Sequence, residues 1–372
     1  MALKPPVEVP QGAIRLNTDS QKLEFFAQDQ WWEMATEESS PIAGRGIILG
    51  SGANPRDEIQ YFSLVTMGDA ADFGNLNSGR SSTTSVSNSI RGYCCGGYYA
   101  PGEQNEIQEI IIATQGNAID FGDLTHTMAR GNRGEVSSST RGIVFGRQGY
   151  YDVIQYITLG QKGNAVDFGN LTYSQENAGG CASPTRGILW GGEKQPSPHY
   201  VNNIEYITIA TTGNAVDFGD KTALVTTGTG AGNAIRGLYA GGGPAYPNSI
   251  DMVTIATTGN AVDFGDKINN VTTVTGGGNS VRGLAAGGGP VYSNAIQMVT
   301  IATTGNAVDF GDDLSPSGSG YLGSNSQSSP IRAFFTTGYQ PSPGTSTKMI
   351  RSFNIASGGT AIDWGDASTV IS

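Results

Sequence analysis

A unit of 45 to 54 residues recurs seven times in this chain of 372 residues, and this repeat restricts the possible folds more than any other feature. The triplet Asp-Phe-Gly, with Trp for Phe in the last copy, begins at Asp72, Asp120, Asp167, Asp217, Asp263, Asp309 and Asp363. An Arg, followed by Gly in six copies, stands at Arg45, Arg91, Arg141, Arg186, Arg236, Arg282 and Arg332. The two markers alternate strictly. A regular period of this length is typical of repeat architectures.

Each unit has room for four short strands. In the copy that begins at Arg236, residues 236–240 form an apolar run that ends at a Gly cluster, and residues 250–256 are rich in β-branched side chains, as strands are. A Thr-Gly-Asn turn at 258–260 and a return strand at 261–264 follow, and residues 267–280 leave space for one more strand. No segment of the unit carries the 3.6-residue period of an amphipathic helix.

Seven such units predict an all-β fold, a seven-bladed β-propeller with four-stranded blades of about 46–50 residues. A β-helix needs shorter rungs, and a Greek-key sandwich does not repeat seven times. We expect the propeller to cover residues 37–372 and a small N-terminal β-hairpin extension to lie within residues 1–36. Two closures are open: residues 37–44 add a strand to the blade that contains Asp363, which we favour, or each blade is contiguous in sequence.

Charge and cysteine content exclude several classes of protein. The formal net charge is −11, and Lys and Arg form no basic run, so a nucleic-acid partner is not expected. Three cysteines, two of them adjacent at Cys94 and Cys95, do not make a disulfide framework. The N-terminus lacks the apolar core of a signal peptide, and no apolar run is long enough for membrane insertion. We therefore expect assembly in a reducing compartment.

The marker residues favour a structural role over a metal site. A buried Arg and a buried Asp that recur together predict seven Arg–Asp ion pairs between strands or blades, because an unpaired buried charge costs far more than a paired one. Three residues after the marker Asp, some copies have Asp and others have Asn, a change of charge that a calcium site would not tolerate. These residues are Asn75, Asp123, Asn170, Asp220, Asp266, Asp312 and Asp366. The aromatic residue of the triplet is predicted to fill the core between blades.

Catalysis is not expected. The triplet matches the metal-binding motif of protein kinases, but it occurs seven times and without that motif's partner sequences. Only two histidines, His126 and His199, are present, and neither repeats. Cys94 and Cys95 occupy strand positions where other copies have small or apolar residues. The sequence thus predicts no enzyme activity, no cofactor and no metal.

The loop after the first apolar run of each unit varies in length and content, and six of the seven loops carry Tyr. These are Tyr98, Tyr99, Tyr150, Tyr151, Tyr200, Tyr246, Tyr292 and Tyr339. In a propeller these loops emerge on one face, where a ring of Tyr suits stacking on sugars or a polar protein contact. The alternative, that each Tyr packs on its own blade, stays open.

The N-terminal segment lies outside the repeats. Residues 12–34, which follow a Pro-containing segment, predict a small hairpin. Because a hairpin of this size is marginally stable alone, we expect its exposed residues to contact a partner surface. These residues are Ile14, Arg15, Phe25, Trp31 and Trp32. The pattern at Gly12, Ile14, Arg15, Asn17, Thr18, Glu24 and Trp32 resembles the attachment hairpin of many bacteriophage tail-fibre and other virion proteins. The repeats resemble those of structural proteins of marine bacteriophages, especially phages of cyanobacteria, and are broadly kelch-like.

This resemblance implies a virion component, assembled in the host cytoplasm and attached to other virion proteins through the N-terminal arm. A tail-fibre or appendage protein would use its propeller to bind host surface glycan or a neighbouring virion protein. Hairpins of this type also imply a homo-oligomer, with a trimer as the expectation. Two alternatives remain: a purely structural decoration or connector protein of capsid or tail, and a glycan-cleaving propeller, for which the sequence offers no carboxylate pair unique to one blade.

Overall fold

The computed structural model describes residues 10, 12–17, 22–27, 30–33, 44–49, 56–99, 101–128, 135–146, 151–176, 179–194, 199–226, 228–243, 247–270, 275–289, 293–314, 325–336, 338–340 and 344–369. The chain divides into two compact units, Met1–Ala43 and Gly44–Ser372. The domain boundary that we expected, between residues 36 and 37, lies outside the described residues.

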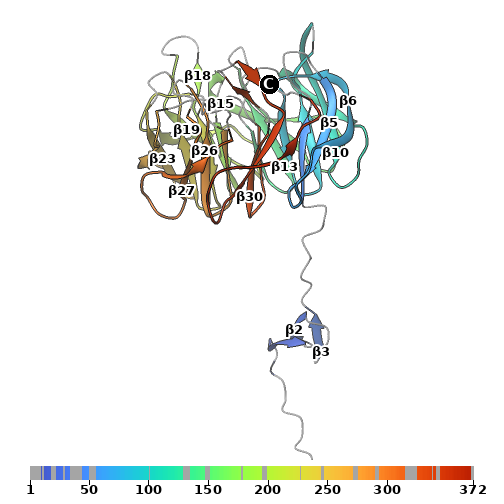
Figure 1. Cartoon of the computed structure of the whole chain (residues 1–372). Helices are drawn as coiled ribbons and strands as arrows, with labels where there is room; N and C mark the ends of the chain where they lie inside the picture. The colour runs from blue at the N-terminus through green and yellow to red at the C-terminus, as the bar shows by residue number, and fades with distance from the viewer. Residues whose placement is uncertain are drawn as a thin grey trace, which may run out of the picture. The chain divides into compact units, whose positions relative to one another are not determined.

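The second unit is a seven-bladed β-propeller, as the repeat predicted (Figure 1). Strands within a blade are antiparallel and follow one another in sequence from the axis to the rim, and the innermost strands of consecutive blades contact each other. No α-helix occurs in the part of the chain that the structure describes, so none there could span a membrane.

Four sets of strands make up the blades. The innermost strands are β7 (Thr84–Ser87), β12 (Glu135–Ser137), β16 (Gly179–Ala182), β21 (Thr229–Gly232), β25 (Thr275–Gly278) and β29 (Asn325–Ser328). The second strands, which begin at the marker Arg, are β4 (Arg45–Leu49), β8 (Arg91–Cys95), β13 (Arg141–Phe145), β17 (Arg186–Trp190), β22 (Arg236–Ala240), β26 (Arg282–Ala286) and β30 (Arg332–Thr336). The third strands are β5 (Arg56–Ser63), β10 (Gly102–Ile111), β14 (Tyr151–Thr158), β19 (Asn203–Thr208), β23 (Ser249–Thr254), β27 (Ala295–Thr300) and β33 (Met349–Asn354).

The outermost strands contain the Asp-aromatic-Gly triplet. They are β6 (Ala71–Arg80), β11 (Ile119–Met128), β15 (Val166–Glu176), β20 (Val216–Asp220), β24 (Val262–Asp266), β28 (Val308–Asp312) and β34 (Ile362–Asp366). The loops add four two-residue strands: β9 (Tyr98–Tyr99), β18 (Glu193–Lys194), β31 (Tyr339–Gln340) and β32 (Thr345–Ser346). The outermost strands of blades 1 to 3 are about twice as long as those of blades 4 to 7, so the blades are not equivalent in their outermost strands.

The described part of blade 7 already has four strands, all from its own sequence, in the order β29-β30-β33-β34. Residues 37–43, most of the segment that we favoured as an added strand of this blade, lie outside the described residues. In blade 1 the structure describes three strands, β4, β5 and β6, and the residues that precede β4 lie mostly outside the described part. Each blade is therefore contiguous in sequence wherever it is described.

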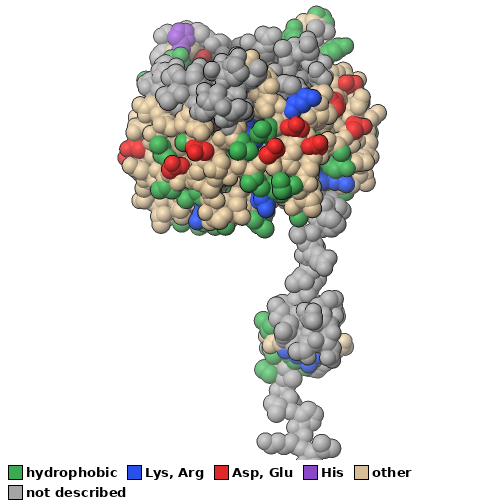
Figure 2. Space-filling view, in the orientation of Figure 1, with side chains coloured by type: hydrophobic (Ala, Val, Ile, Leu, Met, Phe, Trp, Pro, Cys, Tyr) green, Lys and Arg blue, Asp and Glu red, His purple; other side chains and the backbone are tan. Residues whose placement is uncertain are grey.

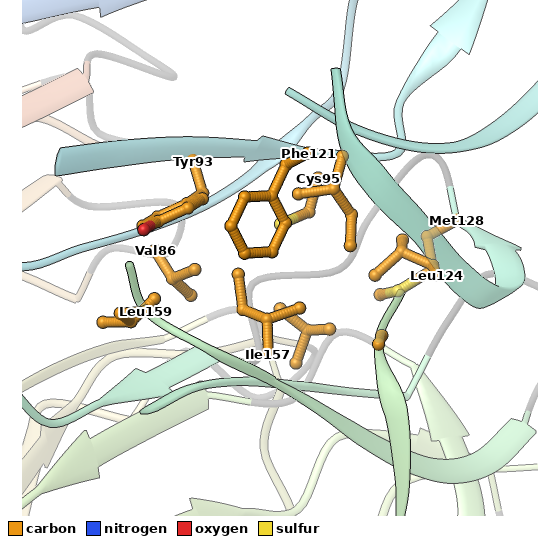
Figure 3. Close-up of a cluster of buried hydrophobic side chains, with 11 residues drawn as sticks. Val86, Tyr93, Cys95, Phe121, Leu124, Met128, Ile157 and Leu159 are labelled. Atoms are coloured by element: carbon orange, nitrogen blue, oxygen red, sulfur yellow. The ribbon is translucent and has the colours of Figure 1, made fainter. Parts of the chain in front are cut away.

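Aromatic side chains fill the space between blades, as expected for the triplet. All seven triplet aromatics are buried, from Phe121 at 1% exposure to Phe310 at 8%. Figure 3 shows the cluster between blades 2 and 3, where the rings of Tyr93 and Phe121 meet edge to face at 5.0 Å beside Ile157 of the next blade. Since burial of one such side chain stabilises a fold by about 1.5–3 kcal/mol, seven repeated plugs are a large part of the core.

Main-chain hydrogen bonds join each outermost strand to the next blade. The carbonyl of the triplet aromatic accepts from a Gly N–H in the turn between the third and outermost strands of the following blade, at all seven interfaces. The last of these bonds, from Gly68 N to Trp364 O at 2.8 Å, joins blade 7 to blade 1. A second bond, from Ala70 N to Asp366 O at 2.8 Å, lies beside it. The ring thus closes through the same contact that joins its other blades.

The N-terminal unit contains a three-stranded antiparallel sheet, which covers the segment where the sequence predicted a small hairpin. Its strands are β1 (Ile14–Asn17), β2 (Lys22–Ala27) and β3 (Gln30–Glu33), in that order. Arg15 donates to Glu24 at 2.8 Å and lies over the Trp31 ring at 4.0 Å, while Ile14 is 62% exposed. The side chains of Phe25 and Trp32 lie outside the described part.

The triplet Gly is predicted to be essential for the contact between blades. In Gly265→Ala the new Cβ would lie 2.4 Å from the main chain of Gly305, whereas in Gly259→Ala it would meet no atom within 4 Å. Both residues have positive φ, +145° and +155°, so backbone strain is matched and only the clash differs. We expect Gly265→Ala to lower the free energy of unfolding by about 2–3 kcal/mol more than Gly259→Ala, measured by urea denaturation. Equal losses would contradict this role.

Candidate binding face

The marker arginines join neighbouring blades through main-chain carbonyls. Arg45, Arg141, Arg186, Arg236 and Arg282 each donate from Nη1 to a carbonyl just after the third strand of the next blade, at 2.6 to 3.0 Å. Four of these guanidinium groups also lie over an aromatic ring of their own blade, at 4.5 to 5.8 Å: Arg45, Arg141, Arg186 and Arg282. Arg91 instead pairs with Glu109, and Arg332 lies over Trp364 at 4.7 Å.

The marker aspartates lie on the exposed outer wall of the propeller, away from these arginines. Five of them, Asp72, Asp167, Asp263, Asp309 and Asp363, accept from the N–H of the triplet Gly at 3.0 to 3.1 Å. Figure 2 shows Asp and Glu side chains spread over this wall. All fourteen marker residues are among those described, and no marker Arg forms an ion pair with a marker Asp.

The prediction of seven Arg–Asp ion pairs is therefore wrong. In five blades the Arg binds carbonyls of the next blade, and in five blades the Asp accepts the N–H of its own triplet Gly, so the two markers meet separate main-chain requirements. The position three residues later also acts through its main chain. Its carbonyl accepts from an Ala N–H of the next blade at every interface, which explains why Asn and Asp both serve there.

A second repeated set of polar residues was missed from the sequence. The residue opposite the marker Asp on the third strand is buried in every blade: Gln60, Gln108, Gln155, Glu205, Asp251, Gln297 and Arg351. In six blades its side-chain oxygen accepts a main-chain N–H from the preceding blade, at 2.6 to 3.2 Å. Because the chemical type changes between Gln, Glu, Asp and Arg, no sequence pattern marks this set.

In two of the three blades where this buried position carries an ionisable charge, the preceding blade provides the opposite charge. Arg351 donates to Asp313 at 2.5 Å, and both side chains are buried. Burial lowers the pKa of Lys221 to about 7, against the attraction of Asp251 on the next blade. No cation among the described residues pairs with Glu205, and burial raises the pKa of its carboxyl to about 7 although Thr172 donates to it.

The connections between strands define two faces of the propeller. We call loop face the side reached by the C-terminal ends of the second strands, and turn face the opposite side, which holds the short turns before the marker arginines. Tyr98, Tyr99, Tyr151 and Tyr200 all follow a second strand within their blades, so all four lie toward the loop face, as predicted. Tyr150, Tyr246 and Tyr292 lie outside the described residues, and of Tyr339 only the main chain, in β31, is described.

Contacts between blades hold these loops in place. Tyr98 forms a main-chain bridge to Ser81 of blade 1, and β18 from the loop of blade 4 pairs with the extended β15 of blade 3. Arg80, fully buried, donates to the carbonyls of Gly96 and Glu106 and pairs with the Glu106 carboxylate. These loops therefore do more than pack Tyr rings on their own blade. They are also tied to the blade before them.

Three tyrosines on blades 2 and 3 expose large parts of their rings: Tyr99 at 46%, Tyr151 at 38% and Tyr173 at 46%. Tyr173, on the long strand β15, was not among the predicted residues because it lies outside the variable loops. Its ring lies 4.5 Å from Lys194 Nζ. We call Tyr99, Tyr151 and Tyr173 the tyrosine set; together they provide flat apolar surfaces with polar edges on the loop face.

Among the described residues, no group of three or more His, Cys, Asp or Glu side chains is arranged to hold a metal ion. Cys94, Cys95 and Cys181 are free thiols, and burial raises the pKa of Cys94 to about 11 and that of Cys181 to about 12. Because the thiolate is the reactive form, these cysteines are poor nucleophiles near neutral pH.

The fold is that of a seven-bladed β-propeller, and its repeats are consistent with the kelch-like type. No protein-family model matches the chain, and no curated protein matches it with significant similarity.

Separate roles for the markers predict unequal costs for their removal in blade 6. Arg282→Gln loses hydrogen bonds to Ile355 O and Ala356 O and should lower the free energy of unfolding by about 2 kcal/mol. Asp309→Asn keeps an oxygen for the N–H of Gly311 and should cost less than about 0.5 kcal/mol. Chemical denaturation of both single variants and the double variant checks this. We expect a coupling energy near zero between the two substitutions. A large coupling energy would support an ion pair between Arg282 and Asp309.

The buried Glu205 predicts a pH-dependent stability. Its pKa in the folded protein is raised from 4.5 to about 7, so folding favours the protonated form and wild-type stability falls as pH rises from about 4.5 to 7. Glu205→Gln, which restores the amide found in four other blades, should add about 2–3 kcal/mol at pH 8 and almost nothing at pH 4. Melting experiments over a pH series measure the difference. Gln155→Glu, at the matching place in blade 3, should introduce the same pH dependence.

Proposed function

We propose that this protein is a non-enzymatic binding protein that recognises carbohydrate through the loop face of its propeller. The observation that carries the proposal is the tyrosine set, three exposed rings on one face of a closed ring of blades. Aromatic faces stack well on the apolar faces of sugar rings, and the phenol oxygen adds a hydrogen bond at the edge.

The scaffold supports this role. The blades are joined by main-chain bonds at every interface, so loops on one face can change in length and content without loss of the ring. Bridges to the preceding blade also hold Tyr98 and β18 in place, and a surface that is ordered before a ligand arrives has a lower entropic cost of binding. A rigid ring with variable surface loops is a common way to build a recognition surface.

The finer proposal concerns the place of the protein. The resemblance of residues 12–32 to a phage attachment hairpin favours a virion component, anchored to other virion proteins through the N-terminal unit and assembled in the host cytoplasm. That unit exposes Ile14 and carries an Arg15–Trp31 stack, and so small a sheet gains stability from a partner. In a tail appendage the loop face would meet host surface glycan. In a decoration or connector protein it would pack on other virion chains.

Replacement of the tyrosine set tests carbohydrate recognition. The triple variant Tyr99→Ala, Tyr151→Ala, Tyr173→Ala should bind cyanobacterial surface polysaccharide, immobilised on a biosensor, at least tenfold more weakly than wild type, because each stacked ring contributes about 1 kcal/mol. The control Val65→Ala, Met67→Ala truncates exposed side chains on the turn face and should bind as wild type does. Equal loss in both variants, or no binding by wild type, would remove the glycan proposal.

Antibody labelling of purified phage particles, viewed by electron microscopy, tests the place of the protein. Label at the tail tip or fibres supports host adhesion. Label over the head or at the neck replaces adhesion by the decoration or connector role, and absence of label from the particle overturns the virion proposal altogether.

A further inference from the structure

On the turn face, the residue just before the marker Arg is an exposed aliphatic side chain in four blades. These residues are Ile90 at 58% exposure, Ile235 at 65%, Val281 at 55% and Ile331 at 63%. The same position holds Thr140 in blade 3 and Thr185 in blade 4, so the turn itself does not require an aliphatic residue. Burial of this aliphatic surface would be favourable, and the propeller alone does not provide it.

Hydrogen bonds between turns connect three of these four positions. Asn233 Nδ2 donates to Ser280 O at 3.0 Å, which joins the turn of blade 5 to that of blade 6. Asn279 Nδ2 donates to Pro330 O at 2.8 Å, which joins the turn of blade 6 to that of blade 7. The aliphatic side chains of blades 5 to 7 therefore lie on neighbouring turns of one ordered surface.

The turn face also carries few charged side chains. Its described turns contain one acid, Asp69, and one base, Lys162, and both side chains are exposed. These turns are residues 64–70, 88–90, 112–118, 138–140, 159–165, 183–185, 209–215, 233–235, 255–261, 279–281, 301–307, 329–331 and 355–361. The marker arginines begin at this face too, but they are half-buried, and five of them bind carbonyl groups of the next blade. In a chain with 32 Asp and Glu residues, two copies meet here with little repulsion between acids.

We propose that the turn face binds the turn face of a second copy of this chain. A closed dimer has a two-fold axis, so each contact between different residues occurs twice. With the two propellers coaxial, a two-fold axis through blade 2 exchanges blades 1 and 3, blades 4 and 7, and blades 5 and 6.

This arrangement pairs the charges and the aliphatic side chains of the two copies. Asp69 and Lys162 lie in the same turn, between the third and outermost strands, of blades 1 and 3. The two-fold axis therefore brings Asp69 opposite Lys162 of the second copy, and the reverse. It also brings Ile90 against its own counterpart and Ile235 against Val281 of the second copy.

A lipid surface matches this face less well. Side chains that hold proteins at a membrane interface are typically Trp, Phe and Leu, together with several Lys or Arg. The described turns of this face contain no aromatic residue and a single Lys. One acid and one base that exchange places about a two-fold axis fit a second copy better. The pairing uses the face opposite the tyrosine set and does not depend on the proposed carbohydrate recognition.

Light scattering during size-exclusion chromatography of the full-length protein, over a dilution series, measures this association. We expect a dimer with a Kd of about 1 μM. The double variant Ile235→Asp, Val281→Asp places carboxylates in the aliphatic contact and should raise the Kd at least tenfold. The control Val216→Asp, Val262→Asp makes the same change on the outer wall, at side chains 51% and 52% exposed, and should dimerise as wild type does.

Three results would overturn the proposal. One is a monomeric wild type, and another is an equal loss of association in the two double variants. The third is a trimer that Ile235→Asp, Val281→Asp leaves intact, because such an assembly would not use the turn face.

A double-mutant cycle at the charged residues tests which blades meet. Asp69→Asn introduces the amide found at this place in blades 2 to 6, and it keeps an acceptor for the N–H of Asp366. Lys162→Gln introduces the residue that blade 2 has there, Gln115. Each single variant should raise the Kd severalfold, and the double variant should be no weaker than either single variant. Additive losses would contradict the pairing of blades 1 and 3.

Cysteine cross-linking tests the position of the two-fold axis. Ile90→Cys should give a disulfide-linked dimer under mild oxidation, because the axis brings this residue against its own counterpart. Ile331→Cys should give none, because it faces Thr185 of the second copy. Cross-linking through Ile331→Cys instead of Ile90→Cys would refute an axis through blade 2.

Discussion

The propeller depends on a main-chain contact, the hydrogen bond from a turn Gly to the carbonyl of the triplet aromatic in the preceding blade. It forms at all seven interfaces, and the close approach of the two backbones leaves no room for a Cβ on the triplet Gly. The bond from Gly68 to Trp364 joins the last blade to the first through this same contact. The residues that recur most regularly in the repeat are therefore those that this main-chain contact requires.

Side chains differ between blades at positions that this main-chain contact does not constrain. In the buried position of the third strand, four blades use Gln, and blades 4, 5 and 7 use charges. The Asp313–Arg351 pair is opposite in sense to Lys221 and Asp251, so the wrong neighbour would bury an unmatched charge. Removal of one partner from a buried pair is costly, and such pairs help each blade to pack on its proper neighbour. The residues that distinguish one loop from another are thus different from the buried residues that distinguish one blade from another.

Much of the fold could be predicted because the repeat contains it. Seven triplets predicted seven blades, and the buried Phe between blades followed from its recurrence beside strand-like sequence. The ion pairs were predicted wrongly because five of the seven arginines bind carbonyl groups of the next blade, which every residue possesses and no sequence pattern marks. Tyr173 was missed because its strand is longer in blade 3 than in blade 4, a difference that strand propensity does not reveal.

By itself, the sequence determined the number of blades, the order of strands within each and the aromatic core between them, because these depend on local propensity and on a repeat that any reader can count. Only the tertiary structure decided which blades touch and through which main-chain groups the last blade contacts the first. Those features join residues about 50 or about 300 positions apart, and the contact between them is set by packing geometry that no single segment encodes.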